Sequence, residues 1–235
     1  MENRKPMIHV KDIRKVYQMG DEKVVALNRI NLKIYRGEIC CIFGTSGSGK
    51  STLLNQLAGM EKPTRGEVLI RGINVSRMNE EELAKFRQEY IGFIFQSYNL
   101  LPTMTAIENV ALPLMFCGMK RQKREAIAGQ LLCKVGLGHR LDHYPGQMSG
   151  GQQQRAGIAR AFVTRPQVVF ADEPTGNLDS KTTAEIMKMI TGFARRYRQT
   201  IILVTHDPGM SRYADRIVTL VDGNIIGDER KGVEI

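Results

Sequence analysis

The sequence of 235 residues has no tryptophan, only four cysteines and no apolar run of membrane-spanning length. Cys40 and Cys41 are adjacent, Cys117 and Cys133 stand apart, and no CxxC pair occurs, which argues against a disulfide framework and a cysteine metal site. The longest apolar stretches are strand-sized, whereas a membrane-spanning helix needs roughly 18 apolar residues or more. We therefore expect that the chain does not cross a membrane by itself.

The first residues, Met1 to Pro6, are polar and charged, and they lack the apolar stretch of a secretory signal. This pattern predicts a cytoplasmic location. Hydrophobic residues make up 42% of the chain, which suffices for a large core and excludes collagen, coiled coil and wholesale disorder.

Basic residues outnumber acidic ones, 34 against 24, and the net charge is +10. Such a surface attracts a polyanion or an anionic membrane face. The basic clusters Lys120 to Arg124 and Arg195 to Arg198 are short and have no aromatic platform beyond Tyr197, so no nucleic-acid partner is expected. The first cluster is also explained by a solvated helix face.

Two kinds of strand pattern alternate along the chain. Ile8 to Tyr17 and Val24 to Ile34 mix apolar and charged residues, which is typical of half-buried antiparallel strands. Ile39 to Phe43 is apolar on both faces, as in a central parallel strand, and so are Val168 to Ala171 and Ile201 to Val204. With a helical segment between the last two, the pattern predicts a βαβ series and a doubly wound α/β core.

Between Gln96 and Ser149 the sequence is helical and rich in loops. We predict helices over Thr105 to Val110 and over Lys120 to Val135, where apolar residues recur at a spacing of four. This stretch is interpreted as an inserted helical lobe. The tail Asp228 to Ile235 is charged and contains glycine, and it is expected to lie outside regular structure.

A phosphate-binding motif, G-x-x-x-x-G-K-[ST], follows the first buried strand and opens a predicted helix. Its glycines allow successive amide groups to converge on phosphate oxygens, and the helix N-terminus adds positive charge. Lys50 is expected to reach the β and γ phosphates, and Ser51 to bind Mg²⁺. The site comprises Gly44, Thr45, Ser46, Gly47, Ser48, Gly49, Lys50, Ser51 and Thr52.

Polar residues follow the other buried strands at the ends where ligands gather in an open α/β sheet. Asp172 is predicted to hold the metal, together with Ser51 and Gln96. Glu173 suits a general base, and His206 is expected to contact the γ phosphate. The predicted catalytic residues are Glu173, His206, Lys50 and Gln96.

The segment Ser149-Gly150-Gly151-Gln152 resembles the L-S-G-G-Q signature of ABC transporter ATPases, with Met148 in place of the leucine. The serine is expected to open a helix, so that its hydroxyl and the glycine amides form a second phosphate-binding element. The resemblance implies a head-to-tail dimer in which the signature of one copy closes over the ATP held by the other.

Further matches to this family run from about Val10 to Ile226. Tyr17 resembles the aromatic that stacks on adenine, Gln96 the Q-loop glutamine, Asp172 and Glu173 the Walker B pair, and His206 the switch histidine. The D-loop, usually S-A-L-D, is less similar, and Thr45 stands where many relatives carry proline. The D-loop segment here reads Gly176-Asn177-Leu178-Asp179.

The resemblance implies a single domain, 1–235, with a P-loop NTPase (RecA-like) parallel-sheet core, an N-terminal antiparallel β subdomain and an inserted α-helical subdomain. The core is assigned to residues 1–96 and 155–235, and the helical signature lobe to 97–154. Segments such as Phe95 to Pro102 and Pro174 to Ser180 are most similar to the macrolide-export and lipoprotein-release ATPases.

The expected partners are a second copy of the chain and a membrane permease, contacted through residues 97–116. Gln96 would act as a hinge, and Tyr98, Leu100, Leu101 and Met104 would either grip the permease or pack inside the lobe. Membrane association would be indirect, on the cytoplasmic face, with ATP and Mg²⁺ as cofactors. The cargo would be exported or extracted, and it would be lipophilic, a peptide or a lipoprotein.

Two other functions remain open. The chain could be an ATP-driven regulatory clamp on a membrane protein, controlling a cell-wall hydrolase or sensing peptides without transport. It could also be an ABC ATPase acting on ribosomes or DNA, but such proteins usually carry two cassettes or a long coiled-coil insertion, and neither is visible here.

Overall fold

The computed structural model describes residues 5–231 and divides into two compact units. Of the described residues, the first unit comprises 5–87 and 200–231, and the second comprises 88–199. Helix α2 (Glu80–Tyr90) runs across the first boundary in the sequence. Each unit is described by itself below.

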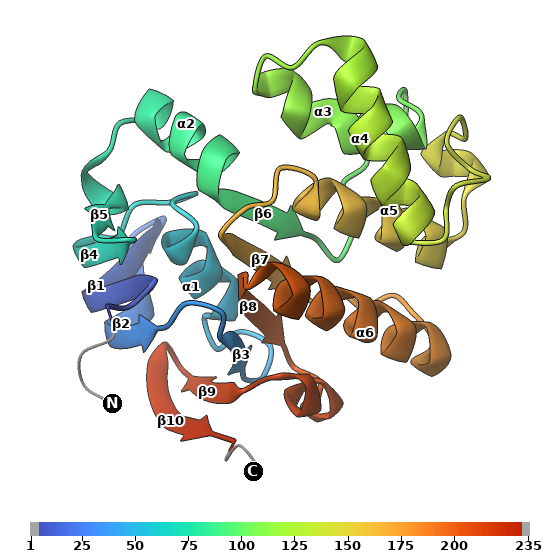
Figure 1. Ribbon diagram of the computed structural model, residues 1–235. Helices are drawn as coiled ribbons and strands as arrows, with labels where there is room; N and C mark the ends of the chain where they lie inside the picture. Colours follow the sequence, from blue (N-terminus) through green and yellow to red (C-terminus); the bar gives the residue numbers. More distant parts are fainter. Residues whose placement is uncertain (1–4, 232–235) are drawn as a thin grey trace. The chain divides into compact units, whose positions relative to one another are not determined.

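The first unit is built mainly from strands (Figure 1). Its elements are β1 (Ile8–Met19), β2 (Glu22–Ile34), β3 (Ile39–Phe43), α1 (Lys50–Leu57), β4 (Arg65–Ile70), β5 (Ile73–Asn74), the 3-10 helix η1 (Val75–Arg77), β8 (Thr200–Thr205), the 3-10 helix η3 (Pro208–Tyr213), β9 (Arg216–Val221) and β10 (Asn224–Arg230).

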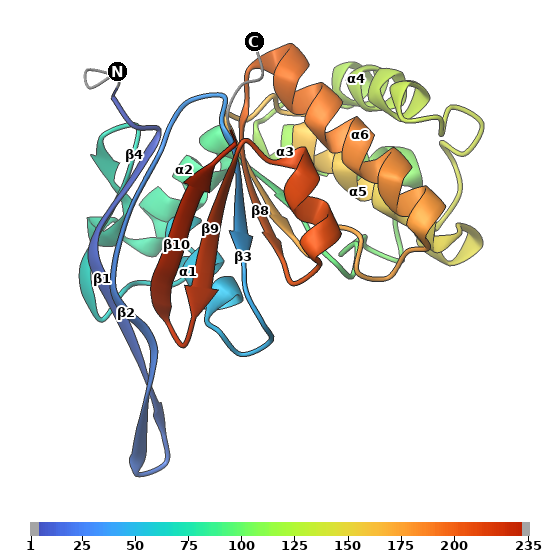
Figure 2. The same cartoon turned by 90° about the horizontal axis from the view of Figure 1, so that it is seen from below.

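The predicted antiparallel strands form one sheet of the first unit, in the order β2-β1-β4-β5. Residues such as Ile8, Val10 and Ile34 are buried there, while charged residues between them face solvent, as the mixed pattern predicted. Figure 2 shows that the β1–β2 hairpin extends well beyond the rest of this sheet.

A second layer of the first unit places β10, β9, β3 and β8 side by side (Figure 2). Strand β3 pairs in parallel with both β8 and β9, so it is a central strand. Its residues Ile39 to Ile42 are buried, which explains why both faces are apolar. Helix α1 packs on β8, β1 and β2.

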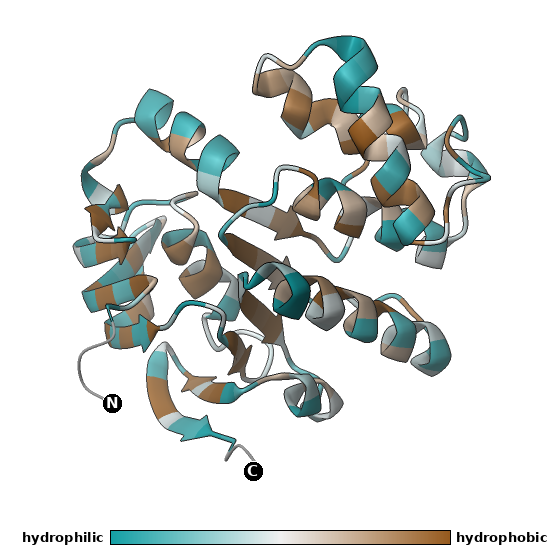
Figure 3. Ribbon diagram, in the orientation of Figure 1, coloured by the Kyte–Doolittle hydropathy of each residue, from teal (hydrophilic) through white to brown (hydrophobic). Residues whose placement is uncertain are grey.

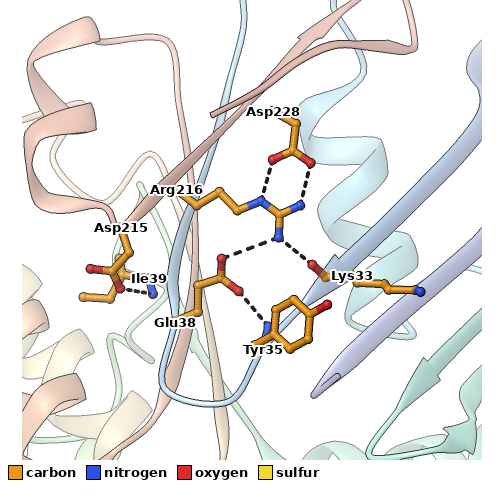
Figure 4. Close-up of polar contacts among 7 residues, drawn as sticks. All are labelled: Lys33, Tyr35, Glu38, Ile39, Asp215, Arg216 and Asp228. Carbon is orange, nitrogen blue, oxygen red and sulfur yellow. Dashed lines mark hydrogen bonds and ion pairs between the residues drawn. The ribbon is translucent and has the colours of Figure 1, made fainter. Parts of the chain in front are cut away.

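The prediction that the tail from Asp228 lies outside regular structure is wrong for Asp228 to Arg230, which belong to β10. Arg216 explains the difference, because its guanidinium donates to both Asp228 carboxylate oxygens at 2.5 Å (Figure 4). The same group donates to the carbonyl oxygen of Lys33 at 2.6 Å and lies 3.5 Å from Glu38. A charged tail is ordered here because its carboxylate meets a buried cation. Residues 232–235 lie outside the described residues.

The second unit is built mainly from helices. Its elements, apart from the end of α2, are β6 (Ile91–Ile94), α3 (Ala106–Phe116), α4 (Arg121–Lys134), the 3-10 helix η2 (Pro145–Gln147), α5 (Gly150–Phe162), β7 (Val168–Asp172) and α6 (Ser180–Tyr197). Strands β6 and β7 pair in parallel. Helices α3, α4 and α5 pack against one another, and α5 also packs on β6 and α6.

Side-chain caps mark the beginnings of α3 and α6 in the second unit. Thr105 and Glu108 form a capping box at the start of α3, and the helix continues past the predicted end at Val110, through Pro113, to Phe116. Asp179 caps α6 by accepting from the amides of Lys181 and Thr182.

The compact units divide the chain differently from the predicted subdomains. Residues 88–96 and 155–199 fall in the same unit as the helices, because α5 packs on both β6 and α6. The predicted helical lobe over 97–154 is therefore part of a larger unit that includes two buried strands. Within residues 5–231, no helix combines the length and apolar composition required to span a membrane.

Candidate functional site

The loop from Gly44 to Gly49 joins the end of β3 to α1, and two of its glycines have no room for a side chain. A β-carbon on Gly44 would lie 2.3 Å from the carbonyl oxygen of Leu220, and one on Gly49 would lie 2.5 Å from that of Ala26. Gly47 and Gly49 also have left-handed backbone angles, with φ of 80° and 98°. The loop can therefore curl tightly enough for its amide groups to converge.

Lys50 begins α1, and only 8% of its surface is exposed. Its Nζ donates to the carbonyl oxygen of Thr45 at 2.6 Å, so the ammonium group folds back over the loop. None of the ion pairs found within residues 5–231 involves Lys50. The nearby Ser48 hydroxyl is buried without a hydrogen-bond partner. A buried ammonium group with one neutral acceptor, beside an unused hydroxyl, fits an anionic ligand.

Tyr17 of β1 lies close to the first turn of α1, where Ser51 is exposed and Thr52 is half-buried. Its phenol is hydrogen-bonded to Thr52 and donates to Glu61 Oε2 at 2.7 Å. Burial and the contact with Glu61 raise the pKa of Tyr17, while the hydrogen bond with Thr52 acts in the opposite direction. A neutral aromatic ring therefore stands beside the phosphate loop's helix, as required for stacking on a base.

His206 directly follows β8 and is exposed. In the parallel pairing of β3 with β8, Phe43 is the register partner of Thr205. The next residues, Gly44 and His206, therefore leave adjacent strands at the same edge of the sheet. This placement agrees with the predicted convergence of Lys50 and His206.

In the second unit, Gln96 and the pair Asp172 and Glu173 lie at one edge of the β6–β7 pair, where Ile94 is the partner of Ala171. Asp172 ends β7, and Glu173 has a left-handed backbone with φ of 44°. Such a conformation is strained in a residue with a side chain and is frequent at functional sites. Hydroxyl, amide and carboxylate oxygens, the donors predicted at Ser51, Gln96 and Asp172, are those that Mg²⁺ prefers.

The D-loop contacts Gln96 within the second unit. Asn177 Nδ2 donates to the carbonyl oxygen of Gln96 at 3.3 Å. A β-carbon on Gly176 would lie 2.7 Å from Gln96 Nε2, so this position leaves room for the glutamine side chain. The two residues that depart from the usual S-A-L-D pattern are thus the two that contact Gln96.

Ser149 caps helix α5, as predicted. Its Oγ accepts from the amide of Gln152 at 3.4 Å, and Gln152 Oε1 accepts from the amide of Ser149 at 3.0 Å. This capping box uses the amides of Ser149 and Gln152 within the chain. The amides of Gly150 and Gly151, in the first turn of α5, have no partner inside the helix, and they are available to an anion.

Comparison with known proteins decides the family. Residues 27–176 match the family model described as ABC transporter. The chain belongs to the ABC transporter family. It is 50% identical over 220 residues to an uncharacterized ABC transporter ATP-binding protein of Methanocaldococcus jannaschii, covering 94% of this chain and 98% of that protein. The motif-based resemblance is confirmed, and the chain is an ATP-binding subunit with the ATPase fold of this family.

A second relative and a solved structure show which members of the ABC transporter family this chain is similar to. The macrolide export ATP-binding/permease protein MacB of Marinobacter nauticus is 47% identical over 224 residues, covering 95% of this chain and 35% of MacB. The chain thus spans about a third of the length of that relative. A solved ATP-binding cassette, a dimer in a post-hydrolysis state bound to ADP and Pi, has a TM-score of 0.90 and 42% identity, covering 96% of this chain and 100% of that one.

Two residues that no sequence motif indicates, Lys15 and Glu61, hold the adenine-stacking candidate Tyr17 of this ABC protein. Lys15 Nζ lies 5.0 Å from the centre of the Tyr17 ring and 3.1 Å from Glu61 Oε2. Burial alone would raise the pKa of Glu61, but hydrogen bonds from Tyr17 and Lys15 outweigh it and lower the pKa. Since Glu61 is 44 residues from Tyr17, no local pattern signals the contact.

Arg160 of α5, which no sequence motif indicates either, holds the segment after the Q-loop glutamine. Tyr98 and Asn99 both have left-handed backbones, with φ of 61° and 49°. The Arg160 guanidinium donates to both of their carbonyl oxygens, at 2.9 Å in the case of Tyr98. A β-carbon on Gly150 would lie 2.7 Å from the Tyr98 hydroxyl. The Tyr98 hydroxyl thus lies against the first turn of α5, and Leu101 is 41% exposed.

Proposed function

We propose that two copies of this chain bind ATP and Mg²⁺ head to tail and hydrolyse the ATP to drive a membrane permease. The observation that carries the nucleotide site is the glycine loop with its nearly buried Lys50, which has one neutral acceptor. The amides of Gly150 and Gly151 supply a second anion-binding element on the same chain. Two such elements per chain are explained by a dimer in which each ATP contacts both copies.

The residues of the proposed site fall into groups that bind phosphate, adenine or metal, or take part in hydrolysis. The loop amides and Lys50 bind the phosphates, and Tyr17 stacks on adenine. Ser51, Gln96 and Asp172 hold Mg²⁺, which when bound neutralises phosphate charge and orients the γ phosphate. Glu173 accepts a proton from the attacking water, and His206 donates to the γ phosphate.

The proposed permease contact lies within residues 97–116, where Leu100, Leu101 and Met104 follow the Tyr98 kink. Arg160 ties that kink to α5, the helix that begins with the signature. Residues 97–154 are proposed to move as one lobe when Gln96 gains or loses its metal and phosphate neighbours. Resemblance to macrolide-export proteins supports export or extraction of a lipophilic, peptide or lipoprotein cargo, from a peripheral position on the cytoplasmic face of the membrane.

Replacement of Glu173 tests the catalytic assignment. Glu173→Gln keeps the shape of the side chain and removes its basicity, so ATP binding should persist while steady-state turnover falls about a hundredfold or more. The variant should also accumulate as a closed dimer with ATP and Mg²⁺ in size-exclusion chromatography. Turnover equal to that of the unmodified chain would exclude Glu173 as the base.

The second candidate function, a regulatory clamp without transport, is distinguished by reconstitution with the copurifying permease in vesicles. ATP-dependent accumulation of substrate supports transport. ATP-dependent activation of the membrane partner without flux supports the clamp. Retention of nucleic acid with strongly salt-dependent affinity would instead support an ATPase acting on ribosomes or DNA.

A further inference from the structure

The turn between α3 and α4 carries exposed apolar and basic side chains, of which Met115 and Phe116 end the range proposed for the permease contact and residues 117–124 lie outside it. We define residues 115–124 as the α3–α4 tip. Phe116 is 65% exposed and Met115 is 37% exposed. Figure 3 shows α3 largely in hydrophobic colours and the beginning of α4 in hydrophilic ones. An exposed phenylalanine beside a basic cluster is typical of an interaction surface.

Hydrogen bonds hold the tip in a defined turn. The amide of Gly118, with φ of 72°, donates to the carbonyl oxygen of Met115 at 2.9 Å, and the amide of Met119 donates to that of Leu114 at 3.1 Å. Arg124 Nη1 donates to the carbonyl oxygen of Met119 at 3.2 Å. Phe116 is therefore presented by an ordered helix end, so docking requires little extra ordering.

The basic residues of the tip are only partly compensated. Arg121 pairs with Glu125 at 2.6 Å, and Arg124 is tied to the turn. Lys120 and Lys123 take part in none of the ion pairs formed within the described chain. They also stand at the positive end of the α4 dipole, where the first turn contains no acidic residue. Two exposed lysines thus remain without an ion-pair partner in the same ten-residue segment as Phe116 and Met115.

A hollow close to the tip is lined by both acidic and basic side chains. It has a volume of about 120 Å³ and lies beside α3 and α4, where Glu108 and Glu125 stand with Arg121 and Arg124 on its lining. Charges of both signs there partly compensate one another, whereas the tip carries apolar side chains and uncompensated positive charge. Exposed apolar side chains together with lysines suit an anionic lipid surface, where apolar groups enter the acyl boundary and lysines face the headgroups.

We propose that the α3–α4 tip binds directly to an anionic lipid surface. Phe116 and Met115 enter the interface between headgroups and acyl chains, and Lys120 and Lys123 face the lipid phosphates and carboxylates. The contact goes beyond the indirect membrane association expected through a permease. It needs no nucleotide, so its test is separate from that of ATP hydrolysis.

The absence of tryptophan from the sequence allows a single-site test. Phe116→Trp places one reporter at the tip, and Met19→Trp places one on β1 at a residue that is 66% exposed, a matched starting exposure. Both full-length proteins are titrated without nucleotide, at low and high salt, with vesicles of phosphatidylcholine alone or mixed with phosphatidylserine. We expect a blue shift only for Phe116→Trp, only with phosphatidylserine, and weaker at high salt. No shift with anionic vesicles would overturn the proposal.

A charge variant separates the tip from the overall basicity of the chain. In the Phe116→Trp protein, Lys120→Glu with Lys123→Glu should lower vesicle affinity by at least about tenfold. The control, Lys181→Glu with Lys188→Glu, changes two exposed lysines of α6 and gives the same net charge. It should change affinity less than about threefold, because charge far from the surface is screened. Equal loss in both pairs, or a shift that appears only when a membrane protein is present, would contradict direct lipid binding.

Discussion

Tyr17 combines a stacking surface with a neighbourhood that fixes its ring. Glu61, Thr52 and Lys15 contact the phenol or the ring from three different segments of the first unit. If Tyr17 contributed to ATP binding only through its hydrogen bonds, loss of the hydroxyl would weaken binding. If Tyr17 stacks on adenine, loss of the aromatic ring weakens binding and loss of the hydroxyl does not.

The two roles of Tyr17 are separated by a pair of substitutions. Tyr17→Ala removes the ring and should weaken ATP binding about 5- to 150-fold, because stacking on one base is worth about 1–3 kcal/mol. Tyr17→Phe keeps the ring, so its affinity should stay within about threefold of the unmodified chain. Calorimetric titration with ATP provides the measurement. Equal affinity of Tyr17→Ala and the unmodified chain would remove Tyr17 from the site.

At the scale of elements, helix α5 connects two motifs that lie far apart in the sequence. Ser149 caps its start, and Arg160, near its end, holds the carbonyl oxygens of Tyr98 and Asn99. The carbonyl oxygens of both residues with left-handed backbones, Tyr98 and Asn99, accept hydrogen bonds from this one guanidinium. Loss of the Arg160 guanidinium would remove a hydrogen-bond donor from the carbonyl oxygens of Tyr98 and Asn99, whose backbones are strained.

Arg160→Ala should therefore lower the free energy of unfolding by about 1–3 kcal/mol, because hydrogen bonds from a charged donor are lost. Amide exchange over residues 97–101 should also become faster. Arg196→Ala, at an exposed position of α6, serves as the control and should change stability by less than about 0.5 kcal/mol. Urea unfolding and hydrogen exchange provide the measurements. Unchanged stability and exchange in Arg160→Ala would show that the Tyr98–Asn99 segment does not depend on the hydrogen bonds from Arg160.

Strands β9 and β10 are joined by the pair of Arg216 and Asp228 (Figure 4). The hydrogen bonds from Arg216 lower the pKa of Asp228 below its ordinary value of 3.8. Because the folded-state pKa is the lower one, this pair stabilises the fold above the ordinary pKa and loses that contribution as pH falls through the lowered value.

Asp228→Asn should lower the free energy of unfolding by about 1–3 kcal/mol near neutral pH, because buried Arg216 loses its anionic partner. The difference from the unmodified chain should start to shrink below the ordinary pKa of 3.8, where Asp228 is protonated in the unfolded chain, and it should vanish once the pH falls below the lowered pKa of the folded chain. Glu229→Gln, at an exposed position of the same strand, is the control and should have little effect. Urea unfolding over a pH series measures both. A difference that stays constant at low pH would contradict the ion-pair explanation.

At the scale of the whole molecule, the proposed dimer places the signature of one copy over the phosphate loop of the other. A cysteine crosslink tests this arrangement directly. Cys117→Ser and Cys133→Ser first remove the exposed thiols, while Cys40 and Cys41 are buried. Ser46→Cys and Ser149→Cys, both at exposed positions, then place one thiol in each element.

In a Glu173→Gln background, this protein should form a disulfide-linked dimer only with ATP and Mg²⁺, because the nucleotide closes the pair. Non-reducing electrophoresis with mass spectrometry would identify a bond between residues 46 and 149. Asp142→Cys in place of Ser149→Cys is the control and should not crosslink to residue 46. Crosslinking that ignores nucleotide, or joins other positions, would contradict the head-to-tail dimer.

The phosphate loop, the capped signature helix and the buried strands were predictable from the sequence because each depends on residues that are adjacent or a few positions apart. Glycine conformation, helix capping and strand burial act over that range. The same local reasoning placed Gln96, Asp172, Glu173 and His206 at strand ends, and it identified the family through the order of its motifs.

Only the tertiary structure decided which distant residues support those motifs. Glu61 meets Tyr17 across 44 residues, Arg160 meets Tyr98 across 62, and Arg216 meets Lys33 across 183. The ordered end of β10 and the room that Gly176 leaves for Gln96 also depend on residues that are distant in the sequence. A charged side chain carries no local sign of its partner, because that partner is brought into range only when strands and helices pack.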